Sequence, residues 1–315
     1  MNLKYLVKFF LCYSPNFLKA FIMKLNKIHE KKCIVERMYR TKVSKDDVHK
    51  LLLQISITGD VMLHTSKVNI GDIEGGTEFL ANEIMSKLDL SKQTLLVSAL
   101  PYRGAFADYL EKTHVFNVKS SPIAMGSINR YIASMPNAIR SLHPTHSVVA
   151  LGKNAAYYVN EHSKDLTPFG EHSPYYKLII NDGQVLLFGA TLNNLTCVCA
   201  VEDMLGEVYS DYLYSKKLFT VQCIDYDNNI VEVSTRCHDP RKAIKRDLSF
   251  VHDDLIRQGI MKTFPLGEAE VSLINIKPFT IYYLKLLDSG ISNRGKIRVS
   301  KELHDKINAV INSLA

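Results

Sequence analysis

The chain of 315 residues lacks the short signatures of several common protein classes. It has no G-x-S-x-G nucleophile elbow and no G-x-x-x-x-G-K-[ST] phosphate loop, which excludes the commonest hydrolases and nucleoside triphosphatases. It has no tryptophan, and no basic face interleaved with aromatic residues of the kind that binds nucleic acid. We therefore expect no nucleic-acid partner.

Cysteine is sparse, with six residues and no CxxC pair. No cleavable signal peptide precedes these cysteines, so we expect reduced thiols and a cytoplasmic protein. The side chains that could be imagined as zinc ligands are Cys197, Cys199, Cys223, Cys237 and His238. Because a CxC spacing without CxxC or HxxxH partners is weak evidence for zinc, we expect no metal, and cysteines buried in strands.

Long hydrophobic runs are also missing, even in the apolar N-terminal part. Residues 1–28 are interrupted by lysines and by Pro15, so no run approaches the length of a membrane span. Residues 1–50 hold 12 Lys/Arg and 4 Asp/Glu, so the net charge of +7 describes this part and not the rest of the chain. Apolar residues at helical spacing between lysines predict an amphipathic segment that lies on an anionic membrane surface or packs on its own domain or a partner.

The remaining chain shows short apolar runs separated by helical patterns. Runs that predict strands cover residues 60–64, 94–100, 147–151 and 185–189, and helical patterns cover residues 78–88 and 154–162. Ser44 followed by two aspartates predicts a helix start, and residues 219–224 and 230–234 predict a hairpin. We expect an arm and linker over residues 1–43, and a single α/β domain over residues 44–315 with a mixed sheet flanked by helices.

Four segments carry chemistry. Residues 59–66 (GDVMLHTS) form a strand that enters a glycine-containing turn, where backbone amides can approach a phosphate or pantetheine closely. Residues 135–144 (MPNAIRSLHP) contain Arg140, which can pair with a phosphate, and Ser141, which can donate a hydrogen bond. The alternative for Arg140 is a structural arginine that caps a helix before a proline turn.

The other two segments are residues 167–174 (TPFGEHSP) and residues 183–203, which end in NLTCVCAVED. In this order the four segments resemble the aminoglycoside 3-N-acetyltransferase family. That family has a strand ending in His-Ser-Ser, an Arg-Ser-x-His-Pro stretch, a Gly-x-x-Ser-Pro turn and an Asn-Thr-x-x-His-x-x-Glu motif.

The resemblance implies an acetyl-CoA-dependent N-acetyltransferase whose acceptor is an amino sugar, either an aminoglycoside or an amino sugar of envelope polysaccharides or their nucleotide precursors. The coenzyme would contact His64, Thr65, Ser66, Arg140, Ser141 and Ser147. The acceptor would approach His162, Glu171 and Asp203. Such a protein would be cytoplasmic, with peripheral contact to the inner face of the membrane through residues 1–28. The rival hypothesis is a catalytically inactive acetyltransferase-like binding protein associated with a membrane or an assembly.

The chain departs from the family at one position, because Cys199 stands where the family has its histidine. An amine at neutral pH is mostly an ammonium ion, so a group must take its proton, and a thiol replaces imidazole poorly. Four outcomes stay open. Glu202 serves as the base, alone or with a recruited histidine; a nearby histidine (His172, His162 or His64) takes its place; acetyl transfer is lost; or Cys199 itself becomes acylated.

Overall fold

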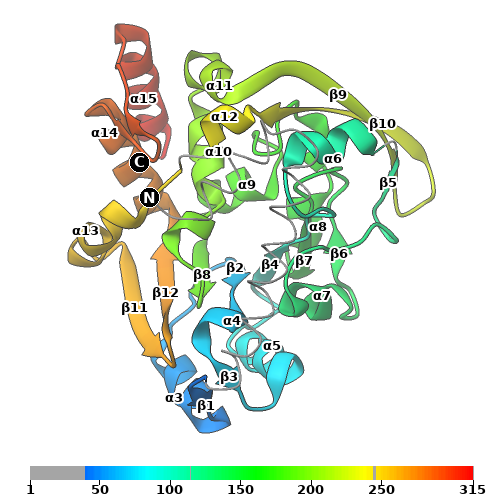
Figure 1. Cartoon of the computed structure of the whole chain (residues 1–315), viewed down its shortest axis with the longest axis vertical. Helices are drawn as coiled ribbons and strands as arrows, with labels where there is room; N and C mark the ends of the chain where they lie inside the picture. The colour runs from blue at the N-terminus through cyan, green and yellow to red at the C-terminus, as the bar shows by residue number, and fades with distance from the viewer. Residues whose placement is uncertain (1–39, 114, 244–245, 315) are drawn as a thin grey trace, which may run out of the picture.

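The computed structural model of the chain describes residues 40–113, 115–243 and 246–314. Its centre is a mixed sheet whose strands are, in order, β11 (Met261–Leu266), β12 (Ala269–Asn275), β8 (Gln184–Phe188), β2 (Val61–Thr65), β4 (Thr94–Ser98), β7 (Val148–Gly152) and β6 (Ile139–Arg140) (Figure 1). β2 pairs in parallel with β4 and β8, and the other neighbouring pairs are antiparallel. The predicted α/β class with a mixed sheet is confirmed.

The central strands are near-continuous apolar runs because both faces of the sheet are covered. Side chains along a strand point alternately to the two faces. Val61 and Leu63 therefore join one hydrophobic cluster, whereas Met62 joins the other. By the same alternation His64 faces the side of Met62. The four strands predicted from the sequence are all present, with ends shifted by one or two residues.

Helices form one layer on each side of this sheet (Figure 1). The helices on the Val61 side are α3 (Lys45–Gln54), α5 (Gly76–Ser86) and α7 (Ser127–Ala133). Those on the Met62 side are α8 (Ala155–Val159), α9 (Pro174–Ile180), α10 (Cys197–Met204), α14 (Ile276–Asp288) and α15 (Lys301–Leu314). The helix predicted over residues 78–88 is confirmed as α5. The one predicted over residues 154–162 is shorter and is followed by a 3-10 turn, His162–Lys164.

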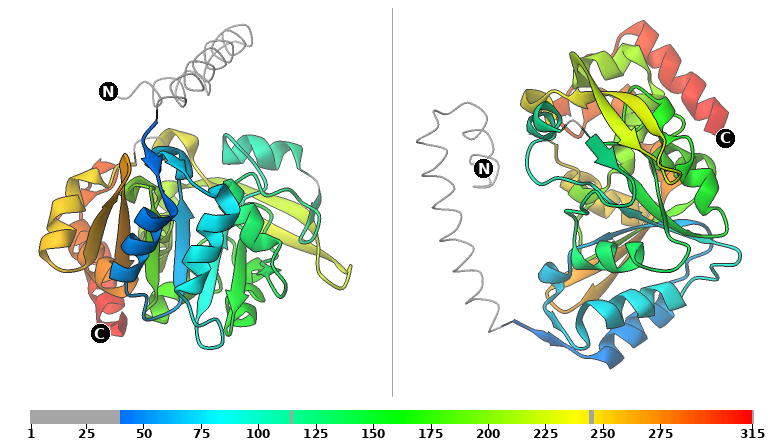
Figure 2. Two further views of the ribbon diagram at one scale, coloured as in Figure 1. Left: turned by 90° about the horizontal axis from the view of Figure 1, so that it is seen from below. Right: turned by 90° about the vertical axis from the view of Figure 1, so that its right-hand side faces the viewer.

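A second sheet has the order β10 (Ile230–His238), β9 (Tyr214–Ile224), β5 (Val115–Asn117). The predicted hairpin is confirmed, although β9 begins five residues earlier than expected. Figure 2 shows that the hairpin extends away from the central sheet. Its inner face packs on α6 (Phe106–Lys112) through a small apolar cluster that includes Phe116 and Cys223. The Asp225 carboxylate accepts the backbone N–H groups of Asp227 and Asn229, which closes the hairpin turn.

The described body begins before Ser44. β1 (Lys42–Val43) pairs in parallel with β3 (Asp72–Ile73), and Val43 is buried. The predicted helix start is confirmed, because Ser44 and Asp47 form a reciprocal capping box at α3. The boundary expected at residue 43 therefore lies earlier, since residues 42–43 belong to the fold. The amphipathic segment predicted over residues 1–28 lies outside the described residues.

The remaining elements are short. They are α4 (Lys67–Ile70), α11 (Glu207–Leu213), α12 (Pro240–Ala243), α13 (His252–Arg257), β13 (Ile291–Ser292), β14 (Gly295–Lys296) and the 3-10 turns Leu192–Asn194 and Ser249–Val251. Within the described ranges no helix is both long and apolar enough to cross a membrane. The turn between β13 and β14 carries Asn293 and Arg294 toward α10, where both side chains bond Glu202.

Candidate active site around helix α10

Cys199 lies in α10, where it is buried against the central sheet. Arg246 reaches its thiol with a 3.4 Å contact from Nη1 to Sγ and also donates to the Leu195 carbonyl. Burial raises the pKa of the Cys199 thiol to about 11, although the nearby Arg246 acts to lower it. The thiol is therefore protonated at neutral pH and is a weak nucleophile.

The expectation of four strand cysteines is half wrong. Cys223 and Cys237 lie in strands, whereas Cys197 and Cys199 lie in a helix, and all four are buried. A short apolar run such as LTCVCAV has no periodicity that separates a buried strand from a buried helix. Among the described residues no group of three or more His, Cys, Asp or Glu side chains is arranged to hold a metal ion.

Glu202 is fully buried and its carboxylate is bound on both oxygens. Arg294 donates to Oε1 and, at 3.1 Å, to Oε2, which makes a bidentate pair. Asn293 Nδ2 at 3.0 Å and the Tyr283 hydroxyl at 3.3 Å also donate to Oε1. Burial acts to lower the pKa of Arg294, but the Glu202 carboxylate outweighs it and the pKa lies above its usual value. This arrangement ties α10 to the β13–β14 turn and leaves Glu202 no free face toward a ligand.

Asp203 has very different partners. Its Oδ2 accepts the hydroxyl of Thr167 at 2.6 Å and that of Tyr214 at 3.0 Å, whereas its Oδ1 is buried without a hydrogen-bond partner. Burial raises the pKa of this carboxyl to about 7, and the two hydroxyl donors only partly offset the effect. A buried carboxylate held by neutral donors can exchange a proton near neutral pH.

Two histidines complete the polar surroundings of α10. His64 at the end of β2 and His238 at the end of β10 each have a buried Nε2 atom without a partner. Burial together with the charge of Arg246 lowers the pKa of His64 to about 4, and burial together with the charges of Arg294 and Arg246 lowers the pKa of His238 to about 3. Both rings are therefore neutral and able to bond a ligand. His238 was not among the predicted site residues, because the sequence suggested only a weak zinc spacing for it.

The residues around position 140 that were predicted to bind coenzyme phosphate form hydrogen bonds within the protein instead. The buried guanidinium of Arg140 donates to Ser147 Oγ at 2.9 Å, and to backbone carbonyls of Ala99 and Ser121, each at 2.6 Å. Ser147 in turn donates to the Ala99 carbonyl at 2.7 Å. Burial lowers the pKa of Arg140 to about 10. These contacts favour the structural alternative for Arg140 and give Ser147 the same role.

Ser141 and His162 form a second closed set. Pro168 O lies 3.0 Å from His162 Nε2 and can only accept, so Nε2 carries the proton and Nδ1 accepts the Ser141 hydroxyl at 2.8 Å. Burial lowers the pKa of His162 to about 3, which keeps the ring neutral. Both ring nitrogens are occupied and the side chain is buried. The predictions that Ser141 binds coenzyme and that His162 binds the acceptor are therefore not favoured.

His172 and Glu171 lie nearer to solvent, before α9. His172 Nδ1 is 2.8 Å from Asp165 Oδ1, and Asp165 also accepts the His172 backbone N–H. Glu171 is exposed, with its carboxylate 3.9 Å from His172 Nδ1. Asp165 acts electrostatically on Asp203, so the His172–Asp165 pair belongs to the surroundings of α10. Both residues keep their predicted roles as hypotheses.

Thr65 and Ser66 lie where β2 enters α4. The Ser66 backbone N–H donates to the Phe188 carbonyl at 2.9 Å, and Thr65 Oγ1 donates to Asn129 Oδ1 at a long 3.4 Å. Nearby, the hydroxyls of Thr77 and Ser127 meet at 2.8 Å. Small polar side chains from three separate elements therefore meet at the carboxyl end of β2.

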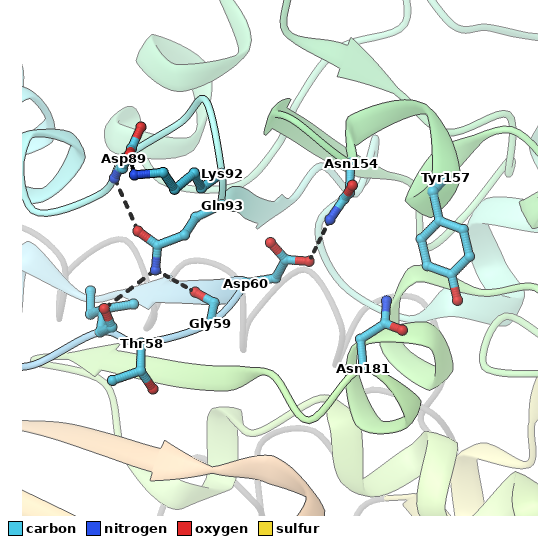
Figure 3. A pocket seen from close by; sticks show the side chains of 10 residues that line it. Thr58, Gly59, Asp60, Asp89, Lys92, Gln93, Asn154, Tyr157 and Asn181 are labelled. Carbon is cyan, nitrogen blue, oxygen red and sulfur yellow. Dashed lines mark hydrogen bonds and ion pairs between the residues drawn. The ribbon is translucent and has the colours of Figure 1, made fainter.

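A cavity of about 750 Å³ lies at the opposite, amino end of the same strands (Figure 3). Asp60, just before β2, accepts the Tyr158 hydroxyl at 2.7 Å and the Thr94 N–H at 2.6 Å. Gln93 donates to the Gly59 carbonyl at 2.9 Å. None of the predicted site residues lines this cavity, and the Asp60 and Gln93 side chains are bonded to Tyr158 and to backbone groups of the protein. It therefore has no part in the site around α10.

The sequence and the structure match known acetyltransferases. The family profile described as aminoglycoside 3-N-acetyltransferase matches residues 62–288. Aminoglycoside N(3)-acetyltransferase IX of Micromonospora chalcea is 28% identical over 259 residues, which cover 74% of this chain and 89% of that protein.

Two solved structures share the fold at lower identity. AAC-IIIb in binary complex with CoASH has a TM-score of 0.63 and 19% identity, covering 82% of this chain and 100% of its own. An AAC(3)-IVa variant in complex with a gentamicin has a TM-score of 0.62 and 22% identity, covering 77% and 87%. The resemblance seen in the four segments is confirmed. The chain belongs to the aminoglycoside 3-N-acetyltransferase family, whose members are CoA-dependent acyltransferases.

Proposed function

We propose that this protein transfers the acetyl group of acetyl-CoA to an amino group of an amino sugar. The observation that carries the proposal is the set of buried polar atoms around α10 that lack partners, namely His64 Nε2, His238 Nε2 and Asp203 Oδ1. Buried polar atoms in native proteins are normally hydrogen-bonded, so three in one region favour a ligand site. All three residues lie within residues 62–288, which match the family, and the charge of Arg246, which contacts the Cys199 thiol, acts on both histidines.

The acetyl group passes directly from sulfur to nitrogen. The neutral amine attacks the thioester carbonyl carbon, the C–N bond forms, the C–S bond breaks, and coenzyme A leaves as the thiol after taking the proton that the amine loses. Backbone N–H groups stabilise the oxyanion of the tetrahedral intermediate. The alternative relay through an acetylated Cys199 is disfavoured, because the pKa of this buried thiol, about 11, leaves little thiolate at neutral pH.

In this proposal the coenzyme lies at the carboxyl end of β2. The polar groups of Arg140, Ser141 and Ser147 form hydrogen bonds inside the protein. Of the predicted coenzyme contacts, the proposal therefore keeps His64, Thr65 and Ser66 at the end of β2. Lys67 follows directly and reaches Thr77 Oγ1 at 3.4 Å. A half-buried lysine beside hydroxyls suits a phosphate or pantetheine group.

Aminoglycosides are the first acceptor class to test, since the relatives carry that name and the AAC(3)-IVa structure holds a gentamicin. A second class is favoured by the charges around Cys199. The Glu202 carboxylate is neutralised by Arg294, and Arg246 stands at the Cys199 thiol. A polycation needs carboxylates that are free to pair with it, and the Glu202 carboxylate is already paired with Arg294, whereas a nucleotide-activated amino sugar has no such need.

The test uses the full chain with acetyl-CoA and measures thiol release, with the product identified by mass spectrometry. The acceptors are gentamicin, other aminoglycosides and nucleotide-activated amino sugars. We expect release that depends on one acceptor class and gives a mono-acetylated amine. Binding of acetyl-CoA without thiol release, across all acceptors, would instead support the inactive binding protein.

A further inference from the structure

Glu202 and Asp203 lie three and four residues after Cys199 in α10, so both are neighbours of Cys199 on the helix. Residues four apart in an α-helix are neighbours, and side chains lean toward the helix N-terminus. Both carboxylates act electrostatically on the Cys199 thiol, Glu202 more strongly, and the Asp203 carboxylate leans toward Cys199. A reacting amine beside Cys199 would be within reach of this carboxylate.

Asp203 and Glu202 are consecutive carboxylates with opposite environments. Glu202 is paired with a guanidinium and bonded on both oxygens, whereas Asp203 has hydroxyl partners on one oxygen and none on the other. Within the described ranges, both side chains that donate to Asp203 are uncharged. Of two neighbouring carboxylates with such different partners, the one without an ion pair is the candidate for proton transfer.

The groups that face Asp203 come from three elements. The segment before α9 supplies the Thr167 hydroxyl and the more distant Asp165 carboxylate, β9 supplies the Tyr214 hydroxyl, and α10 itself supplies Glu202. The hydroxyl donors favour the carboxylate form, whereas burial and the two other carboxylates favour the protonated form. Burial is the largest effect, so Asp203 can take up a proton near pH 7 and release it again.

We propose that Asp203 accepts the proton of the acceptor amine during acetyl transfer, through its free Oδ1. The inference rests on the proposed function. As the amine attacks the thioester, one N–H proton passes to the Asp203 carboxylate, and the departing thiolate takes the same proton from the carboxylic acid. The amine, thioester and carboxylate thus give an amide, a thiol and the carboxylate again, with no other reactant.

The test compares Asp203→Asn with Asp305→Asn, which removes an exposed carboxylate on α15 far along the chain. We expect Asp203→Asn to lower kcat by roughly 10²- to 10⁴-fold, the span of general-base loss, while the affinity for acetyl-CoA stays unchanged. The Asp305→Asn control should keep wild-type kcat. In the wild type, kcat should rise with pH through an apparent pKa near 7, and this limb should vanish in Asp203→Asn.

A second variant keeps the inference testable if Asp203→Asn folds poorly. Thr167→Val removes the 2.6 Å hydroxyl donor to Oδ2, which favours the carboxylate, so the rising limb should move to higher pH. Suppose that the wild type is active. If the rising limb of its pH profile is unchanged in Thr167→Val, or if folded Asp203→Asn keeps full activity, this inference alone is overturned. A wild type that binds acetyl-CoA and acetylates no acceptor overturns the proposed function, and this inference with it.

Discussion

Replacing Arg294 by methionine should destabilise the protein strongly, because it leaves the Glu202 carboxylate buried without its counter-ion. Glu202 is 0% exposed and the Arg294 side chain 8% exposed, so solvent cannot screen the change. Removing one partner of a buried ion pair costs about 3–5 kcal/mol. That is a large share of the ~5–15 kcal/mol by which native proteins are stable. Asn293 and Tyr283 would still donate to Oε1 but carry no charge.

The double variant Glu202→Met/Arg294→Met tests whether the loss of stability comes from the unpaired buried charge. With both charges removed, apolar side chains of similar length fill the space, and most of the lost stability should return. Denaturant unfolding followed by circular dichroism measures all four proteins of the cycle. If Arg294→Met costs less than about 1 kcal/mol, or if the double variant is less stable than either single variant, the buried pair does not have the structural role assigned to it.

A variant of Glu202 distinguishes its two possible roles, as the structural partner of Arg294 and as the catalytic base. If Glu202 holds the β13–β14 turn, Glu202→Gln should lower the midpoint of unfolding, because Arg294 loses its partner, while the folded fraction keeps kcat within about tenfold. If Glu202 is the base, kcat should fall roughly 10²- to 10⁴-fold at unchanged stability.

Three further predictions concern separate parts of the chain. Arg140→Ala should lower the free energy of unfolding by more than about 2 kcal/mol, since several buried carbonyls lose their donor, and leave calorimetric affinity for coenzyme A unchanged; a folded variant with weakened coenzyme binding would restore the phosphate-binding hypothesis. Cys199→Ser should change turnover little, whereas acetylated Cys199 seen by mass spectrometry would replace direct transfer with a thiol relay. Deleting residues 1–28 should abolish sedimentation with anionic liposomes and leave acetyl-CoA binding intact; unchanged sedimentation would contradict the membrane hypothesis.

The central strands and the four segments that resemble the family could be predicted from the sequence, because both depend on local patterns. Apolar runs bounded by turn residues predicted the central strands, and the hairpin between β9 and β10 followed from its turn residues. The order of the four segments identified the family. Helix α10 was the main local error, since its apolar run fits a buried strand as well as a buried helix.

The roles of individual site residues could not be predicted in the same way, because they depend on distant partners. Arg140 bonds the carbonyls of Ser121 and Ala99, 19 and 41 positions earlier in the chain, which a phosphate-binding motif does not reveal. Glu202 is paired with Arg294, 92 residues away. A charged residue in a motif can serve a ligand or a buried counter-ion, and only the fold shows which.

The two carboxylates of α10 illustrate why this distinction decides the chemistry. Consecutive residues on a helix point about 100° apart, so Glu202 and Asp203 necessarily meet different surroundings. Glu202 points to the β13–β14 turn and its arginine, whereas Asp203 bonds hydroxyls. A base for an amine needs a carboxylate that is desolvated and not held by a cation, and the partners of the two side chains leave only Asp203 to satisfy both conditions. The substitution of cysteine for histidine at position 199 therefore does not by itself remove the means of proton transfer from this site.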